Sequence, residues 1–440
     1  MLLTRPKDYE LVIDTTTDYI TALTAISFAA LVPGSTTLTN IERTPLLAQI
    51  EPILASAGIT LNWKENSVTV EVGDPKPFDY LEPIADYDMF KYLLTFAATR
   101  QGSRITIVAE LDNTVQMIVL ALRRMGAELE FRNGATPHVE IIAPISREMK
   151  YHLKRENAKI VPQLMIAMAA QGGSSELLDL FESSRFDYLF ERFISNFRRE
   201  NLVKIDPSDE LERRLAKHSP KVAEFKSRVT LSGGMVQSAE PVDLRPDSEF
   251  AAYLAAAVIS HGKGKLVLRN IHSEDLTFTP LAQLRRMGVE VSTVRESGKT
   301  NLVIAHSTVK SRSVSYDQLH DYPDSVGAIA LANARTGGTA VIRSSPFNTD
   351  REESRRKSIC NLIRGLGIKI AEIGDGIVME GREQLTADAI TTNHDPVCAL
   401  MAAAAPLGTV ARLEVDDLGA AHDRWGANFD RLVALLSTKA

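Results

Sequence analysis

The sequence predicts a mixed α/β protein of two globular domains, each made of three copies of one repeating unit. Three observations predict this fold class: a length of 440 residues, an alanine-rich helical pattern that occurs six times, and a β-prone stretch after each copy. A chain of this length exceeds what one hydrophobic core normally organises, so two or more domains are expected. With 44% hydrophobic and 24% charged residues, the composition is that of a globular rather than a disordered chain.

The first helical pattern is a run of alanine and other apolar residues that ends shortly before a glycine. Its six copies occupy residues 25–32, 93–98, 164–170, 251–259, 328–334 and 399–405. A glycine just past a helix is the expected C-terminal cap, because it adopts the left-handed conformation without a steric penalty. The glycines in this position are Gly34, Gly102, Gly172, Gly262, Gly337 and Gly408. Each copy therefore predicts a helix, a cap and a strand.

A second helical pattern lies between several of these copies and also ends at glycine before an alternating strand. It occupies residues 54–61, 122–129, 284–291 and 363–370. Six units of about 70 residues cannot share one core, so two domains of three units each are expected. The repeat is weakest from Lys217 to Arg228, and Ser232-Gly233-Gly234 follows near the midpoint. We therefore expect a hinge near residues 232–236.

Charge and composition exclude several classes of function. The formal net charge of −6 provides no cationic field to hold nucleic acid or an anionic membrane. Cys360 and Cys398 are too few for a disulfide framework, and no His, Asp or Glu cluster has the spacing of metal ligands, so neither a metal nor another cofactor is expected. No window has the roughly 20 apolar residues of a membrane helix, and the charged start is unlike a signal peptide. A cytoplasmic protein is predicted, and a monomer is compatible with the sequence, which does not fix the oligomeric state.

Two similar tetrapeptides open alanine-rich helices at matching points of two units: Arg245-Pro246-Asp247-Ser248 and Tyr322-Pro323-Asp324-Ser325. Asp247 and Asp324 are the residue type that caps helix N-termini, which is one interpretation. The other interpretation is a binding site. If equivalent helices of all units point the same way, their N-termini gather, and the positive ends of the helix dipoles favour an anionic ligand.

Several motifs, in the same order along the whole chain, point to a known family. They include Gly34-Ser35-Thr36-Thr37-Leu38-Thr39-Asn40, Ala121 to Ala127, Asp247 to Ala257, Tyr322-Pro323-Asp324, and Asn348 followed by Glu353 to Arg356. On these motifs the chain resembles the EPSP synthase and enolpyruvyl transferase family. The resemblance implies two domains of three βαβαββ units each, joined by a double crossover. It places residues 1–14 with residues 235–440 and leaves 15–234 as the other domain, with hinges near 14–16 and 232–236.

The resemblance also implies that most cationic positions of the phosphoenolpyruvate site are changed. Tyr19 stands where the family has a lysine, Thr24 where it has an arginine, and Asn113 where a further arginine is expected. Lys91 stands where an arginine is usual, after Ala85-Asp86-Tyr87-Asp88. Asn393-His394-Asp395-Pro396 replaces an Asp-His-Arg run, with no arginine from 391 to 400, and the last family lysine falls at Asp423 or Arg424. Of the expected arginines, Arg356 is retained.

The positions that hold the acceptor ring and move its proton are better retained. The resemblance assigns Asp324 as the catalytic carboxylate and Glu353 as its partner in proton transfer, while Glu352 replaces a lysine. The predicted catalytic residues are Asp324, Glu353, Tyr19 and His394. The predicted substrate-binding residues are Gln163, Asn348, Arg356, Glu352, Lys91, Arg185 and Thr24. The expected ligand is a small anionic cyclic molecule.

Three functions follow from this pattern. The loss of about four cationic partners, at roughly 1.5–3 kcal/mol each, removes roughly 6–12 kcal/mol of phosphoenolpyruvate binding. The preferred hypothesis is therefore dehydration of a shikimate-like acid without phosphoenolpyruvate, in which Asp324 abstracts a proton and Tyr19, Glu352 or His394 protonates the leaving hydroxyl. The alternative is carboxyvinyl transfer with the anion site rebuilt from Lys91, Arg355, Arg356 and Arg424. A third is a non-catalytic protein that keeps the fold.

Overall fold

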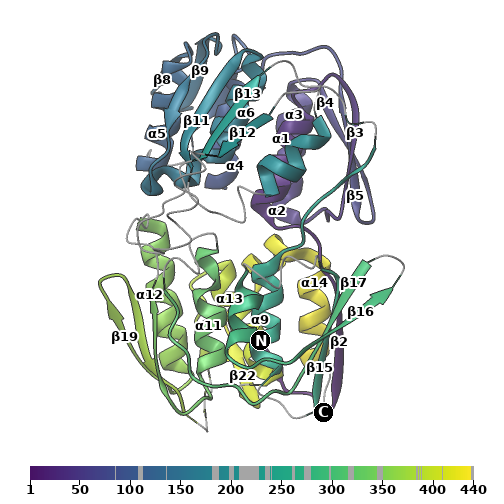
Figure 1. Ribbon diagram of the computed structural model, residues 1–440, viewed down its shortest axis with the longest axis vertical. Coiled ribbons are helices and arrows are strands. Elements are labelled where there is room, and N and C mark those ends of the chain that lie inside the picture. The colour runs from purple at the N-terminus through teal and green to yellow at the C-terminus, as the bar shows by residue number, and fades with distance from the viewer. Residues whose placement is uncertain are drawn as a thin grey trace. The chain divides into compact units, whose positions relative to one another are not determined.

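The computed structural model divides the chain into two compact units (Figure 1). Unit 1 comprises Met1–Asp18, Glu42–Leu46 and Arg245–Ala440, and unit 2 comprises Tyr19–Ile41 and Leu47–Leu244. The domain boundaries expected from the sequence stay a prediction. The structure describes residues 1–84, 86–107, 112–134, 136–180, 188–197, 203–207, 227–232, 238, 240–259, 263–271, 279–296, 299–315, 322–343, 350–382, 385, 387, 389–408 and 410–437.

Unit 2 contains three four-stranded sheets in the described residues. Their strand orders are β14-β3-β5-β4, β6-β7-β9-β8 and β10-β11-β13-β12. In each, the first two strands are parallel and the remaining pairs are antiparallel. The strands are β3 (Gly34–Thr39), β4 (Ile59–Lys64), β5 (Ser67–Val72), β6 (Asp79–Tyr80), β7 (Arg104–Thr106), β8 (Glu128–Arg132), β9 (His138–Ala143), β10 (Lys150–His152), β11 (Ser174–Leu180), β12 (Val203–Pro207), β13 (Ser227–Ser232) and β14 (Val242–Asp243).

The helices of unit 2 include three buried ones, α1, α4 and α6, which contact one another. Their sequences are apolar on most sides, as expected for helices that lie inside a domain. The helices are α1 (Tyr19–Ala29), α2 (Pro45–Ala48, which straddles the unit boundary), α3 (Ile50–Ser56), α4 (Tyr87–Ala97), α5 (Asn113–Arg124), η1 (Arg155–Ile160), α6 (Val161–Gln171), η2 (Tyr188–Phe193) and η3 (Ile194–Phe197).

Unit 1 contains one four-stranded and two three-stranded sheets in the described residues, with strand orders β16-β17-β15-β2, β18-β20-β19 and β1-β22-β21. The N-terminal residues belong here, because β2 runs parallel to β15 and β1 runs antiparallel to β22. Figure 1 shows β2 beside β15 in this unit. The strands are β1 (Leu2–Thr4), β2 (Tyr9–Asp14), β15 (Gly264–Ile271), β16 (Val291–Glu296), β17 (Lys299–Ala305), β18 (Thr339–Arg343), β19 (Lys369–Ile373), β20 (Gly376–Glu380), β21 (Ala389–Ile390) and β22 (Arg412–Val415).

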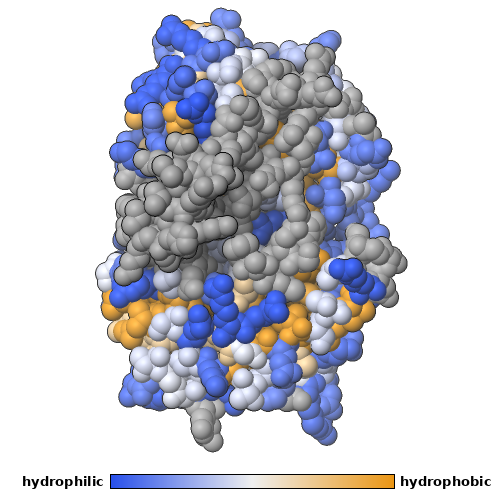
Figure 2. Space-filling model, in the orientation of Figure 1, coloured by the Kyte–Doolittle hydropathy of each residue, from blue (hydrophilic) through white to orange (hydrophobic). Residues whose placement is uncertain are grey.

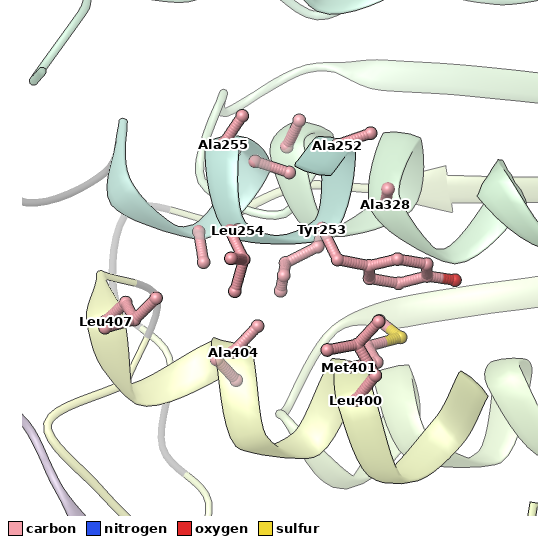
Figure 3. Close-up of a cluster of buried hydrophobic side chains, with 14 of the residues drawn as sticks. Ala252, Tyr253, Leu254, Ala255, Ala328, Leu400, Met401, Ala404 and Leu407 are labelled. Atoms are coloured by element: carbon pink, nitrogen blue, oxygen red, sulfur yellow. The ribbon is translucent and has the colours of Figure 1, made fainter. Parts of the chain in front are cut away.

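The helices of unit 1 surround a core built from α9, α11 and α13, which contact one another. Alanine supplies much of this contact, because a small side chain allows helices to approach closely. The helices are α9 (Ser248–Val258), α10 (Pro280–Arg286), η6 (Pro323–Ser325), α11 (Val326–Asn333), α12 (Asp350–Gly365), α13 (Pro396–Ala404), η7 (Ala405–Leu407) and α14 (Gly419–Ser437). Figure 3 shows the apolar side chains with which α9 and α13 pack: Tyr253, Leu254, Leu400, Met401 and Ala404.

Of the six glycines predicted to cap the alanine-rich helices, Gly172 is found as a left-handed cap, whereas Gly102 and Gly337 have positive φ but lie beyond helices that end at Ala97 and Asn333. Gly172 caps α6 in the left-handed conformation, with φ 76°. The same sign of φ occurs at the glycines after the second helix of four units: Gly58, Gly126, Gly288 and Gly367. Two expected caps are wrong in detail. Gly34 begins β3 after α1 has ended at Ala29, and Gly408 has φ −153°, so it is not left-handed. Gly262 lies outside the described residues.

The outer surface is ordinary for a globular chain. Outside the residues drawn in grey, the visible face is mainly hydrophilic, and its hydrophobic areas lie among hydrophilic ones (Figure 2). The large hydrophobic side chains that are exposed within the described residues are Met1, Leu2, Leu120 and Val294. Among the same residues, no helix combines the length and the apolar composition that crossing a bilayer requires.

Candidate functional site

Three acidic residues precede the central helices of unit 1, and two of them are helix caps. Asp247 accepts hydrogen bonds from the backbone N–H groups of Glu249 and Phe250, both at 2.9 Å, at the start of α9. Asp395 caps α13 through the backbone N–H groups of residues 397 and 398, at 2.9 and 3.0 Å. The capping interpretation is therefore confirmed for Asp247.

Asp324 is not a cap, although it occupies the same place in its tetrapeptide as Asp247. It lies within the short helix η6, and its carboxylate binds two arginines instead of backbone N–H groups. Nη1 of Arg355 donates to Oδ1 of Asp324, and Nη2 of Arg424 donates to Oδ2 at 3.3 Å. The capping interpretation of Asp324 is wrong, because the helix start leaves its side chain to the arginines.

Arg355 joins two of the acidic residues. Its Nε donates to Oδ2 of Asp395 at 2.8 Å, while its Nη1 binds Asp324. The exposed fractions of the side chains are 10% for Arg355, 14% for Asp324 and 17% for Asp395. The negative charge of Asp395 is therefore compensated by an internal arginine.

Burial and charge act in opposite directions on the two arginines. Burial lowers the pKa of Arg355, but the Asp324 and Asp395 carboxylates outweigh it and hold that pKa above its ordinary value. Burial and the neighbouring Arg355 also lower the pKa of Arg424, and attraction by Asp324 and other nearby acids outweighs both. Both guanidinium groups therefore stay charged, and they bring two fixed positive charges to one carboxylate.

The backbone of Asp324 is fixed from α9. Its N–H donates to Oε1 of Glu249 at 3.1 Å, and the hydroxyl of Tyr253 donates to its carbonyl oxygen at 2.6 Å. Tyr253 is 1% exposed, and burial, followed by the Asp324 charge, raises the pKa of its hydroxyl. Asp324 is thus held by two residues of a neighbouring helix as well as by the arginines.

Arg424 is in turn supported by Trp425. The guanidinium carbon of Arg424 lies 4.9 Å from the centre of the Trp425 ring, and Nε1 of the ring donates to Oδ2 of Asp247 at 2.9 Å. Asp247 is buried, and burial, followed by the negative charge of Asp18, raises its pKa. We call Asp324, Arg355, Asp395, Arg424, Trp425 and Asp247 the charge cluster.

Three of the predicted residues in unit 2 lie on α1 and α4 and contact other side chains. The hydroxyl of Tyr19 donates to Oδ1 of Asp86 at 2.9 Å, and Asp86 also caps α4. Lys91 forms an ion pair with Asp88 three residues before it on the same helix. The hydroxyl of Thr24 bonds to its own helix and lies 2.7 Å from the hydroxyl of Tyr92. Asp86 and Asp88 are therefore in internal contacts.

Gln163 lies in the first turn of α6, with 3% of its surface exposed. Its Oε1 is buried and has no hydrogen-bond partner within the described residues. A buried acceptor without a partner carries a cost of about 1–3 kcal/mol. Gln163 is thus one of the side chains that a ligand with a donor group would satisfy.

The remaining predicted residues lie on α12, before α13 or outside the described residues. Glu353 is exposed on α12 and lies two positions before Arg355, so the helix points the two side chains to different faces. His394 is 86% exposed and its Nδ1 lies 2.7 Å from Asp417. Arg356 is half-buried. Asn348, Arg185 and the side chain of Glu352 lie outside the described residues.

Sequence reasoning did not single out Trp425, Tyr253 or Glu249 as members of the site. Their signal is weak, because Tyr253 and Glu249 belong to a buried helix in which every side chain is packed. Trp425 is one of two tryptophans, directly after a candidate arginine. Within the described residues, no group of three His, Cys, Asp or Glu side chains is arranged to hold a metal ion.

Comparison with known sequences identifies relatives. The family model described as EPSP synthase (3-phosphoshikimate 1-carboxyvinyltransferase) matches residues 200–432, more than half of the chain. The 3-phosphoshikimate 1-carboxyvinyltransferase of Bacillus subtilis is 25% identical over 230 residues, which is 51% of this chain and 54% of that protein. In that match, the chain spans about half of the relative's length. The corresponding enzyme of Leuconostoc citreum is 21% identical over 378 residues, which is 83% of this chain and 81% of that protein.

Comparison with solved structures gives the same fold over nearly the whole chain. EPSP synthase from Acinetobacter baumannii matches with a TM-score of 0.73 at 17% identity, covering 98% of this chain and 97% of that chain. The enolpyruvyl transferase NikO from Streptomyces tendae matches with a TM-score of 0.77 at 15% identity, covering 99% of this chain and 96% of that chain. The predicted fold class is thereby confirmed.

Proposed function

The chain belongs to the EPSP synthase family, and on this premise we propose that it is an enolpyruvyl transferase. It would move the carboxyvinyl group of phosphoenolpyruvate to a hydroxyl group of a shikimate-type acceptor. The observation that carries the proposal is the convergence of Arg355 and Arg424 on Asp324. Both arginines are mostly buried, and neither stands at a position where the family resemblance assigns an arginine.

The two arginines restore part of the positive charge that the sequence comparison counted as lost. At about 1.5–3 kcal/mol for each charge-assisted hydrogen bond, two such partners contribute about 3–6 kcal/mol. This is about half of the roughly 6–12 kcal/mol that loss of the four family positions removes. The two arginines therefore supply charge-assisted donors for an anion, while Asp324 and Asp395 balance their charge within the cluster.

The arginines also have donors that their contacts with Asp324 and Asp395 do not use. A guanidinium carries five N–H groups in a planar fork, which matches carboxylate and phosphate oxygens. Among the described residues, the acids bind Nε and Nη1 of Arg355, and Nη2 is the donor that we assign to an incoming anion. Nε of Arg424 is buried and has no hydrogen-bond partner within the described residues. A buried charged donor of this kind is stabilised by a bound anion.

Carboxyvinyl transfer requires one proton to leave the acceptor hydroxyl and inorganic phosphate to leave phosphoenolpyruvate. The bond between the vinyl carbon and the phosphate oxygen breaks, a new bond forms between that carbon and the acceptor oxygen, and the acceptor proton ends on phosphate. The arginine pair keeps the Asp324 carboxylate ionised, which is the form that can accept a proton, and its remaining donors can bind the charge that the phosphate carries. We assign these roles to Asp324, Arg355 and Arg424.

Dehydration without phosphoenolpyruvate, the function that we preferred from the sequence, has less support. The family and both named relatives are carboxyvinyltransferases. His394, one of the groups proposed to protonate a leaving hydroxyl, has an imidazole that is mostly in solvent. Enolpyruvyl transfer is therefore the better interpretation of the same residues.

The test is incubation of the purified protein with shikimate or 3-phosphoshikimate, with and without phosphoenolpyruvate, followed by mass spectrometry and phosphate release. The proposal expects a product that has gained a carboxyvinyl group, together with inorganic phosphate, when phosphoenolpyruvate is present. Loss of water from the acceptor without phosphoenolpyruvate would instead establish the lyase. Absence of product and of binding heat with both acceptors would establish the non-catalytic alternative.

Substitutions then connect the activity to the arginines. Arg355→Gln and Arg424→Gln are expected to weaken phosphoenolpyruvate binding, measured by calorimetry, by one or more decades each, since about 1.4 kcal/mol corresponds to one decade. Arg343→Gln is the matched control, because Arg343 pairs with Asp375 at an exposed surface position. Equal binding by all three variants would remove the arginines from the proposal.

A further inference from the structure

Trp425 is buried within unit 1 and has a defined partner on each side. It is 8% exposed, and its ring stacks on the ring of Phe250 with the centroids 5.7 Å apart. The indole Nε1 donates to Oδ2 of Asp247, while Oδ1 of the same carboxylate accepts the N–H groups that cap α9. The cap thus fixes Asp247, and Asp247 fixes the rotation of the indole.

The face of the same ring carries Arg424. Its guanidinium carbon lies 4.9 Å from the ring centre, within the range of about 6 Å in which a cation is attracted to an aromatic face. Successive residues of a regular helix do not face each other. Here α14 is broken at the next residue, Gly426, whose φ of 52° and ψ of −131° are not helical.

A second contact holds this break in place. The backbone N–H that follows Gly426, that of Ala427, donates to Oε1 of Glu42 at 2.7 Å. A Cβ atom at Gly426 would lie 2.5 Å from the same oxygen, so the close approach of Glu42 requires glycine. The segment that carries Arg424 and Trp425 is therefore anchored at the indole N–H by Asp247 and at the backbone of Ala427 by Glu42.

We propose that Trp425 is a positioning residue, which holds the guanidinium of Arg424 toward Asp324 and so sets the strength of phosphoenolpyruvate binding. The inference rests on the proposed function. The bond from Arg424 to Asp324 is 3.3 Å long, so the position of this guanidinium depends on its other support. The ring face provides that support, and the indole N–H orients the ring.

The proposal gives separate roles to the aromatic face and to the N–H group of the indole, and two substitutions of Trp425 test these roles. Trp425→Leu removes the aromatic face and should weaken phosphoenolpyruvate binding by roughly 3- to 30-fold, the range expected for a partly desolvated cation–π contact. Trp425→Phe keeps an aromatic face and loses the N–H, and should weaken binding by less than roughly 3-fold. Equal losses in the two variants would overturn the proposal. With the acceptor at saturation, KM for phosphoenolpyruvate should change more than kcat.

Phe429→Leu is the matched control for loss of a buried aromatic side chain. Phe429 lies on the same helix, is 1% exposed and has no place in the charge cluster. It should lower the unfolding temperature and leave the affinity for phosphoenolpyruvate within roughly 2-fold of the wild type, because only the core is changed. An affinity loss as large as that of Trp425→Leu would assign the effect to packing and contradict positioning.

A double-mutant cycle tests whether Trp425 acts through its neighbour. In an Arg424→Gln background, Trp425→Leu should weaken phosphoenolpyruvate binding by no more than a further factor of roughly 2, because the group that it positions is absent. If Trp425→Leu has its full effect in that background, the two residues act independently and the proposal fails.

An NMR measurement distinguishes failure of this inference from failure of the proposed function. The chain has two tryptophans, so a Trp63→Phe variant assigns the indole N–H signal of Trp425. Arg424→Lys should shift that signal in the absence of any ligand, since the guanidinium lies over the ring. If the wild type binds no phosphoenolpyruvate but the shift is seen, the proposed function fails and the contact holds. An unchanged signal overturns the inference itself.

Discussion

Replacing Arg355 by glutamine should lower the free energy of unfolding by about 2–4 kcal/mol. Arg355 holds the carboxylates of Asp324 and Asp395 together, and all three side chains are 10–17% exposed. An exposed ion pair contributes about 0–1 kcal/mol, whereas removal of one partner from a buried pair costs about 3–5 kcal/mol. Because the side chains are only slightly exposed, the expected cost is close to that of a buried pair. Water that reaches the two acids after the substitution reduces the cost below the full buried value.

Equilibrium unfolding in urea, with the midpoint and the slope both determined, measures this change. Arg343→Gln is the control, because Arg343 and Asp375 form a pair with 49% and 42% of the side chains exposed. It should lose no more than about 1 kcal/mol. If Arg355→Gln and Arg343→Gln lower the free energy of unfolding by the same amount, the argument that Arg355 compensates two buried acids is refuted.

Three further predictions concern the residues around this cluster. Tyr253→Phe removes the hydroxyl that donates to the carbonyl of Asp324 and should cost about 1–2 kcal/mol in urea unfolding; an unchanged midpoint would mean that the bond contributes nothing. Gly426→Ala forces a Cβ toward Glu42 at a positive φ and should cost about 1–3 kcal/mol by thermal unfolding, and a variant as stable as the wild type would contradict this geometry. Asp247→Asn tests the pH dependence of stability. In the wild type, burial raises the pKa of Asp247, so the native state keeps its proton to higher pH than the unfolded chain does. The wild-type free energy of unfolding should then fall as pH rises above about 4, and the variant should lack this fall; a difference between the two that is constant from about pH 4 to 7 would be inconsistent with it.

The helices and strands were predictable because the information for them is local. A run of apolar residues followed by a glycine such as Gly172 or Gly288 specifies both the helix and its end within a few residues. Gly408 was mispredicted because the chain after α13 continues as the short helix η7, so no left-handed turn is needed there. The pairing of β2 with β15, in contrast, joins residues 255 positions apart, which no periodicity reports; the family resemblance implied only that residues 1–14 belong with residues 235–440.

The chemistry of the site was less predictable because its contacts are distant in the sequence. Asp247 and Asp324 occupy the same place in similar tetrapeptides, and only the structure separates the cap from the arginine-bound carboxylate. The partners of Asp324 lie 31 and 100 positions away, and the indole that binds Asp247 lies 178 positions away. No local pattern reports such pairings. The sequence nevertheless named Arg355 and Arg424 as candidate anion ligands.

The two arginines also explain why a comparison by position underestimates the charge of the site. Arg355 lies one residue before the position at which the family resemblance places an arginine, and Arg424 lies at or one residue after the position of the last family lysine. One residue along a helix turns a side chain by about 100°, so a neighbouring position faces a different side of the helix. The long arginine side chain can still bring its guanidinium to the site from a neighbouring position. This is easier where the helix is displaced or broken, as α14 is at Gly426. Charge at a site of this kind is therefore better counted from the side chains that meet at Asp324 than from the positions that an alignment pairs.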